Sequence, residues 1–306
     1  MSVLKTALAT PSRMRGIFRY LLQAPKQREN REKLTGLLSP DQLSEGKNKS
    51  AEHPMFNAAL RESIKCGLLI EENEDISINL ELPEAFRHPQ TGDNLLPDTL
   101  VQLFFADNED EEDLGRLIAW YLAQDIYDAP DTWEKVEKLV AEQGVAESLD
   151  LKISSNTLSG QVEDWMCYLG FAWGHASDSN KKLVVAEPTA YFRRNLVAEP
   201  TAYLRRNLND LFQGEAKAKL SIREFIDRLA KKCPVFENGK FRDQVEEKIG
   251  FRLPNHLSTS TAFALFRLQD DGYIKLIRES DADLFVFPSG DKEAGFSHII
   301  LTGVEP

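Results

Sequence analysis

The sequence predicts an α+β fold, mainly α, in which two winged helix-turn-helix domains flank a helical middle region. Near each end of the chain, three helical patterns of apolar residues precede two strand patterns. Between them, apolar residues keep helical spacing in a stretch that is strongly acidic. We therefore expect three parts, at residues 1–95, 96–215 and 216–306.

The composition is that of an ordinary soluble globular protein, with 42% apolar and 28% charged residues. The net charge of −12 excludes a uniformly basic coat for nucleic acid. No apolar run approaches the roughly 20 residues that span a bilayer, and the first residues lack a signal-peptide pattern, so we expect no membrane partner. Three distant cysteines, Cys66, Cys167 and Cys233, predict neither a disulfide framework nor a zinc pair. This favours a reduced, cytoplasmic protein.

Charge is unevenly distributed along the chain. Residues 1–70 hold 12 basic and 6 acidic residues, a net of +6, whereas residues 71–165 hold 5 basic and 24 acidic residues, a net of −19. The remainder is nearly balanced, with 20 basic and 19 acidic residues. A basic head beside an acidic neighbour favours a head that meets phosphate or an acidic partner. The alternative is a block structure that serves solubility alone.

The first predicted helix follows Thr10-Pro11-Ser12, which supplies a cap and a helix-starting proline. A second, short helix covers 31–38, and a third begins near Met55 and ends at Gly67. The segment LLIEENEDISINLEL then predicts two strands around an acidic turn, the second alternating over 76–82. Three helices followed by a hairpin is the order of a winged helix.

Winged helices generally place the third helix in the major groove of DNA and the wing against the backbone. Asn57, Arg61 and Lys65 share the face of the third helix opposite its apolar face, so they are the predicted contacts to base edges or phosphate. Flanking phosphate contacts are expected from four more cations, Arg13, Arg15, Lys47 and Lys49. The alternative is an ordinary solvated face of a scaffold, and the acidic wing counts against DNA because wings usually bring positive charge.

A second winged helix is predicted at the carboxyl end. A helix capped by Ser221 is followed by a helix in GKFRDQVEEKIG and by a third helix that ends at Gly272. The segment YIKLIRESDADLFVF predicts a strand, a turn and a strand. Leu265 precedes Gly272 by seven residues, as Leu60 precedes Gly67. The third helix here is mostly apolar, which favours a protein interface or a scaffold over DNA reading.

In the middle region, apolar spacing predicts helices at 114–122, 133–140 and 162–173. The acidic run at 107–113 lacks the order and the glycine of a calcium loop, so a helix cap is favoured. The segment 185–208 is a tandem repeat, VAEPTAYFRRNL followed by VAEPTAYLRRNL, in which only Phe192 and Leu204 differ. We expect one copy to fill a structural position, with a helix starting at its Pro-Thr, and the other to be an insertion or an extension.

Motifs for catalysis are absent from the sequence. It contains no GxGxxG, no phosphate loop, no GxSxG and no HExxH, and its five histidines are dispersed. We therefore predict no catalytic residue, no metal site and no cofactor, and thus a protein that is not an enzyme.

Several stretches give the chain a resemblance to a known family. These are LATPSRMRGIFRYLL, AWYLAQD, DWMCYLGFAW, PTAYLRRNL and ALFRLQDDGYIKLIRESDADLFVF. Together they resemble the DpdG family of bacteria, whose members are encoded in clusters that insert 7-deazaguanine derivatives into DNA and restrict unmodified DNA. The tandem repeat departs from the single copy expected of that family.

The resemblance implies an accessory subunit of a DNA modification or restriction system, which serves phage defence. Its expected partners are DNA and other subunits of a defence complex, bound through the winged helices. Two alternatives remain open: a pure protein–protein scaffold, and a transcriptional regulator with no role in defence.

Overall fold

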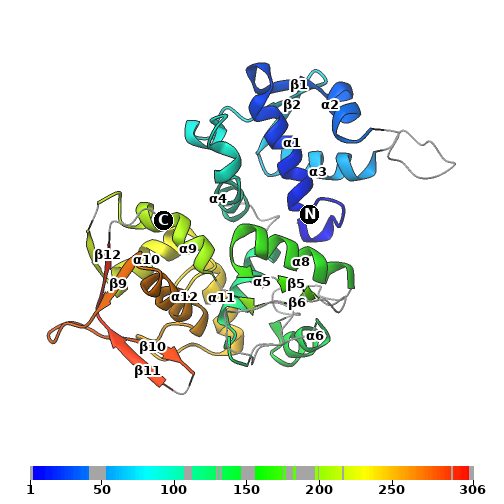
Figure 1. The fold of residues 1–306 in the computed structure, drawn as a ribbon. Helices are drawn as coiled ribbons and strands as arrows, with labels where there is room; N and C mark the ends of the chain where they lie inside the picture. Colours follow the sequence, from blue (N-terminus) through cyan, green and yellow to red (C-terminus); the bar gives the residue numbers. More distant parts are fainter. Residues whose placement is uncertain are drawn as a thin grey trace. The chain divides into compact units, whose positions relative to one another are not determined.

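The computed structural model describes most of the chain: residues 3–40, 53–106, 112–128, 130, 133–145, 156–173, 175–176, 182–183, 197–198, 200–215, 217–290 and 292–302. The backbone forms two compact units, Met1–Glu111 and Glu112–Pro306. Their elements are mainly helices with small sheets, which confirms the predicted mainly helical α+β class (Figure 1). The division into three parts stays a prediction.

The first unit combines four helices with a three-stranded antiparallel sheet of order β1-β3-β2. Its apolar core includes Met14, Phe18, Leu60 and Ile76, all of them buried. The elements are α1 (Pro11–Gln23), β1 (Arg28–Asn30), α2 (Arg31–Leu38), α3 (Pro54–Lys65), β2 (Leu69–Glu72), β3 (Asp75–Ile78) and α4 (Gly92–Phe105), with short 3₁₀ turns at Val3–Lys5, Pro25–Gln27 and Glu84–Arg87.

Two local expectations in this unit were wrong. The hydroxyl of Thr10 accepts no hydrogen bond from the first turn of α1, which begins at Pro11; it lies 3.1 Å from the hydroxyl of Ser12 instead. The second strand is shorter than its apolar alternation predicted, since β3 ends at Ile78 and Leu80 is 69% exposed.

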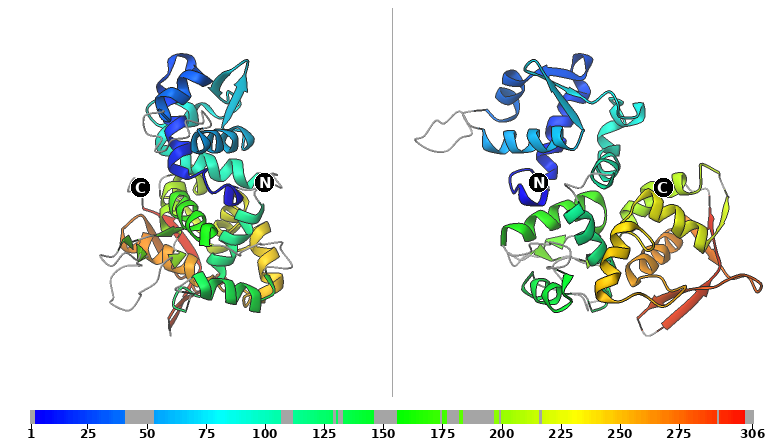
Figure 2. Two further views of the ribbon diagram at one scale, coloured as in Figure 1. Left: turned by 90° about the vertical axis from the view of Figure 1, so that its right-hand side faces the viewer. Right: turned by 180° about the vertical axis from the view of Figure 1, so that it is seen from behind.

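The second unit contains seven helices and nine short strands in its described residues. Helices α10 and α12 lie on one side of the sheet β8-β12-β9 (Figure 2). The helices are α5 (Glu112–Ala123), α6 (Trp133–Glu142), α8 (Asn156–Leu169), α9 (Thr201–Leu211), α10 (Ile222–Lys232), α11 (Lys240–Ile249) and α12 (Thr259–Asp270), of which α9 belongs to the repeat discussed below. The strands are β4 (Ala172–Trp173), β5 (His175–Ala176), β6 (Lys182–Leu183), β7 (Val197–Ala198), β8 (Lys219–Ser221), β9 (Ile274–Ile277), β10 (Phe285–Ser289), β11 (Lys292–Phe296) and β12 (His298–Leu301).

The two strands expected in YIKLIRESDADLFVF form, but they do not pair with each other as a hairpin. The first strand, β9, pairs with β12, whereas the second, β10, pairs with β11. Strand β12 can take this place because its alternate residues Ile299 and Leu301 are buried. The helix expected over 162–173 is also shorter, since α8 ends at Leu169 and Trp173 lies in β4.

The two units repeat one arrangement of elements. In the first, α1, β1, α2, α3, β2 and β3 follow each other, and in the second α9, β8, α10, α12, β9 and β12 do so, with α11 and the hairpin β10–β11 inserted. The sheet orders agree, β1-β3-β2 and β8-β12-β9, and both are antiparallel. We call the two sets the first copy and the second copy. The second copy thus begins at α9, one helix before the first helix of the winged helix predicted at the carboxyl end. The strand β8, which follows α9, is too short to show an alternating pattern in the sequence.

The register of the strands fixes which residues correspond. Asn30 pairs with Asp75, and Ser221 pairs with His298, so Asn30 and Ser221 hold the same position. The side chains of both accept hydrogen bonds from the first turn of the helix that follows, as N-caps do. The helices α3 and α12 correspond residue by residue, because both have 12 residues and are followed directly by the same left-handed glycine turn, at Gly67 and Gly272.

The tandem repeat supplies the first helix of the second copy. Helix α9 begins at Thr201, inside the repeat 197–208, as its Pro-Thr predicted. Tyr203, Leu204 and Leu208 are buried, so this repeat fills a structural position. The other repeat, 185–196, lies outside the described residues.

Candidate functional site

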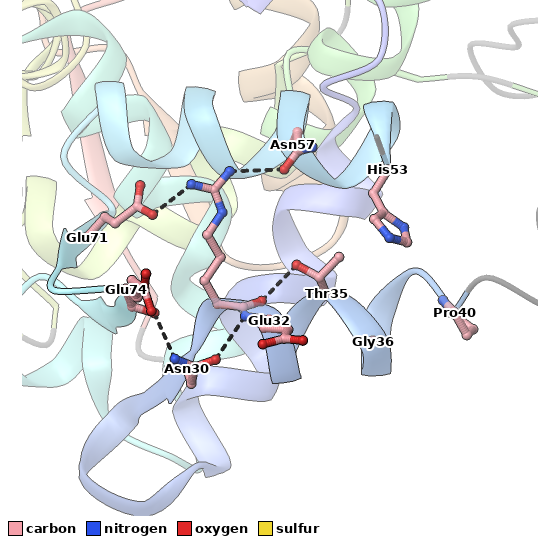
Figure 3. A pocket seen from close by; sticks show the side chains of 10 residues that line it. Asn30, Glu32, Thr35, Gly36, Pro40, His53, Asn57, Glu71 and Glu74 are labelled. Carbon is pink, nitrogen blue, oxygen red and sulfur yellow. Dashed lines mark hydrogen bonds and ion pairs between the residues drawn. The ribbon is translucent and has the colours of Figure 1, made fainter. Parts of the chain in front are cut away.

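A groove opens in the first unit between α2, the start of α3 and the strands β2 and β3. Its volume is about 880 Å³ (Figure 3). Ten residues line it: Asn30, Arg31, Glu32, Thr35, Gly36, Pro40, His53, Asn57, Glu71 and Glu74. Three glutamates and one arginine give this lining an acidic balance, which by itself repels phosphate.

Arg31 lines the groove and donates hydrogen bonds to three other lining residues. Its Nη1 donates to Glu71 Oε1 of β2 at 2.8 Å, and its Nη2 donates to Asn57 Oδ1 of α3 at 3.1 Å (Figure 3). The backbone N–H of Arg31 donates to the carbonyl oxygen of Glu74 in the turn between β2 and β3. One side chain therefore ties α2 to α3 and to the hairpin β2–β3. This hairpin is held a second time by the ion pair of Arg28 with Asp75.

The structure places all three predicted contacts of the third helix on α3. Asn57 lines the groove and accepts the bond from Arg31. Arg61 is 66% exposed, and its Nε lies 3.4 Å from Glu62 Oε1. The Nζ of Lys65 lies 4.0 Å from Glu62 Oε2. Glu62 is buried, and its Oε1 also accepts a hydrogen bond from the hydroxyl of Thr6. Both cations of α3, Arg61 and Lys65, therefore lie close to the carboxylate of Glu62.

The flanking cations lie elsewhere. Arg13 donates to the carbonyl oxygen of Leu8, and Arg15 donates through Nε and Nη2 to both carboxylate oxygens of Asp93, at 2.7 and 2.8 Å. The Arg15 hydrogen bonds hold the pKa of Asp93 below its usual value. Neither arginine lines the groove. Lys47 and Lys49 lie outside the described residues.

Sequence reasoning missed Arg31, whose side chain links Glu71 and Asn57 across the groove. The local signal was present, because Asn30 before Arg31 and Glu32 is a helix cap followed by an acidic first turn. The partner of Arg31 could not be predicted from the sequence, because Glu71 lies 40 residues further along the chain. The charge of the whole unit also differs from that of its head: residues 1–111 hold 13 basic and 18 acidic residues, a net of −5.

The third helix of the second copy, α12, is covered by other parts of the chain, in contrast to α3. All its residues from 259 to 269 are buried or half-buried, and the chain itself covers it. Ser260 Oγ donates to the carbonyl oxygen of Leu122 in α5 at 2.6 Å. Phe266 packs against Phe287 and Phe296 of the hairpin β10–β11, with ring centroids 5.7 and 6.1 Å apart.

Metal ligation and membrane insertion find no support in the described part of the chain. No three His, Cys, Asp or Glu side chains gather there as a metal would require. None of the helices it contains has the length and apolar character needed to cross a bilayer.

Comparison with known proteins gives one match. The model of a family described as DpdG-like matches residues 1–282, which include both copies as far as β9 and the turn after it. No curated protein and no solved structure matches the chain.

Proposed function

The chain belongs to the DpdG-like family, and from that premise we propose that it is a non-catalytic, cytoplasmic accessory subunit of a bacterial Dpd system. The family is associated with systems that modify DNA with 7-deazaguanine derivatives. In this proposal both copies are winged helices, and the protein acts by binding partner subunits through them.

The contrast between α3 and α12 carries this proposal. In the second copy, the face of the third helix is covered by protein, through α5 and the hairpin β10–β11. In the first copy the corresponding face is open, with Met55 50% exposed and Arg61 66% exposed. The surface of the third helix is thus buried against protein in the second copy and exposed to solvent in the first copy.

Reconstitution with single partners tests the proposal. The full chain is mixed in turn with each purified protein encoded in its Dpd cluster, and light scattering after size exclusion measures the mass of any complex. A stable complex with at least one of them is expected. If the chain elutes at its own mass in every mixture, the partner-binding function is wrong.

DNA contact is a second candidate function, favoured by the exposure of Arg61 on α3. Each phosphate that a cation neutralises contributes a slope of about −0.9 in log affinity against log salt. With Arg61, Lys65 and two or three flanking cations on phosphates, the full chain should then bind duplex DNA with a slope of roughly −3 to −5 in log affinity against log salt. Arg61→Glu should flatten the slope by more than one contact, and Glu71→Gln should strengthen binding because it releases Arg31 from its carboxylate. A chain that shows no salt-dependent binding at low ionic strength has no such function.

A further inference from the structure

Large apolar side chains are exposed where α2 ends and α3 begins. Leu37 is 52% exposed, Leu38 is 38% exposed and Met55 is 50% exposed. A hydrogen bond of 3.2 Å between His53 Nδ1 and Ser39 Oγ joins the end of α2 to the start of α3. We call the surface formed by Leu37, Leu38 and Met55 the α2–α3 corner.

Two of the three counterparts of this corner in the second copy are buried, whereas the counterpart of Leu37 is Arg228, which is half-buried and forms an ion pair with Glu224. Leu38 corresponds to Leu229 and Met55 to Ser260, by the register of the strands and helices described above. Both Leu229 and Ser260 are fully buried. Ser260 is covered by the end of helix α5, whose Leu122 carbonyl accepts its hydroxyl hydrogen bond. At the position of Met55 the second copy therefore shows what can cover this surface, and the occupant there is the end of a helix.

Charge next to the corner separates the two copies. Arg61 of the first copy corresponds to Phe266 of the second, which the hairpin aromatics cover. Because Arg61 is 66% exposed, a helix that extends from Met55 along α3 to this position meets a cation where the second copy has an aromatic contact. A carboxylate on the incoming helix complements this cation.

We propose that the α2–α3 corner docks an amphipathic helix of a partner subunit, whose apolar side chains cover Leu38 and Met55 and whose carboxylate meets Arg61. The inference rests on the proposed partner-binding function and names the surface that performs it. Duplex DNA does not suit this surface, because leucine and methionine gain nothing from phosphate and the adjoining groove is acidic. Apolar anchors of this kind typically dominate the affinity of a protein interface.

Substitution at the corner tests the surface against a matched control. Met55→Asp places a charge in the proposed interface, whereas Leu80→Asp places the same charge at another exposed apolar residue of the same unit. Neither side chain belongs to the buried core, so both variants should fold, which circular dichroism and thermal melting verify. For a cluster protein that binds the full chain, Met55→Asp should weaken the dissociation constant at least tenfold, and Leu80→Asp should change it less than twofold.

A photo-crosslink identifies the occupant. The full chain with p-benzoylphenylalanine in place of Met55 is irradiated in the complex, and the linked peptide is sequenced by mass spectrometry. The expected product joins residue 55 to a segment with helical apolar spacing and at least one Asp or Glu. A link to DNA, or to a second copy of this chain, overturns the proposal.

The two levels of the argument fail differently. If a cluster protein binds but Met55→Asp and Leu80→Asp bind it equally well, the corner is wrong and the partner-binding function stands. If no cluster protein binds the wild-type chain, the function is wrong and the docking surface falls with it.

Discussion

Asn79 and Thr302 make the same hydrogen bond in two different parts of the chain. Asn79 Nδ2 donates to the carbonyl oxygen of Gly67 at 2.7 Å, and Thr302 Oγ1 donates to the carbonyl oxygen of Gly272 at 2.6 Å. Each glycine follows the third helix of its copy in the left-handed conformation, with φ of 81° and 83°. The carbonyl of a left-handed turn leaves the helical hydrogen-bonding pattern, so a side chain just beyond the last strand completes it.

Removing this donor should destabilise either unit. Asn79→Asp keeps the acceptor that the backbone N–H of Glu81 uses but cannot donate to Gly67, and Thr302→Val keeps the shape but loses the hydroxyl. Each change should lower the free energy of unfolding by about 1 kcal/mol, the typical net value of one hydrogen bond. Urea denaturation measures it. Thr302→Ser, which retains the donor, should stay near the wild type, and an equal loss in Thr302→Ser and Thr302→Val would contradict this account.

Deleting either repeat should give a folded protein, with a small difference between the two deletions. Removal of 185–196 retains Leu204, and removal of 197–208 brings Phe192 into the same buried position; the two products differ only there. A phenylalanine in a packed leucine site costs about 1–3 kcal/mol. Thermal melting of the pair should therefore rank the 185–196 deletion as the more stable. Loss of cooperative unfolding in that deletion would mean that both repeats belong to the core.

Arg252 should matter more to stability than the exposed apolar residues on either side of it, Phe251 and Leu253. Its Nη2 donates to the Glu237 carbonyl oxygen at 3.1 Å, its Nη1 pairs with the buried Glu237 carboxylate, and its Nε lies 3.2 Å from Glu246. Breaking such a buried network should cost about 3 kcal/mol in Arg252→Ala, because it leaves carboxylates unpaired. Phe251→Ala and Leu253→Ala are matched controls, since both side chains are 67% exposed and should change the free energy of unfolding by less than about 0.5 kcal/mol. Equal losses in all three variants would show that the segment is held by packing instead.

Acid should weaken the first unit through Asp93. Hydrogen bonds from Arg15 lower the pKa of Asp93 in the folded state, so the stability that the pair contributes is fully present above the usual carboxyl pKa of 3.8. It is lost as the pH falls through the lowered folded value, because the protonated carboxyl no longer pairs with Arg15. Urea midpoints measured from about pH 6 to about pH 3 should fall further in the wild type than in Asp93→Asn. Identical pH profiles would exclude this pair as a source of acid sensitivity.

Helices α1, α2 and α3 were predictable because their signals are local. Apolar spacing, Pro11 at the start of α1 and Gly67 after α3 all lie within or next to the helix that they define. The partner of β9 was not predictable, because β12 competes with the nearer β10 and the outcome depends on packing of the whole unit. The strands β1 and β8 have three residues each, too few for a period to be visible.

The candidate site divides in the same way. The face shared by Asn57, Arg61 and Lys65 follows from helical spacing alone. The links of Arg31 to Glu71 and Asn57 depend on tertiary structure, and they decide how much of that face is available. Charge counts over 1–70 made the head look basic, but the carboxylates that neutralise it, Glu71, Asp75 and Asp93, come from the following 25 residues.

The cover of α12 has a consequence for how the two copies are occupied. Helix α5 is joined to α12 by the chain, so its docking loses no translational freedom and occurs once, at folding. A helix that docks on α3 arrives from solution and pays that entropy each time, so its occupancy follows the concentration of its source. In the proposed docking, one fold thus serves twice in this protein, as a permanent contact at α12 and as a reversible contact at α3, and only the reversible contact depends on whether a partner is present.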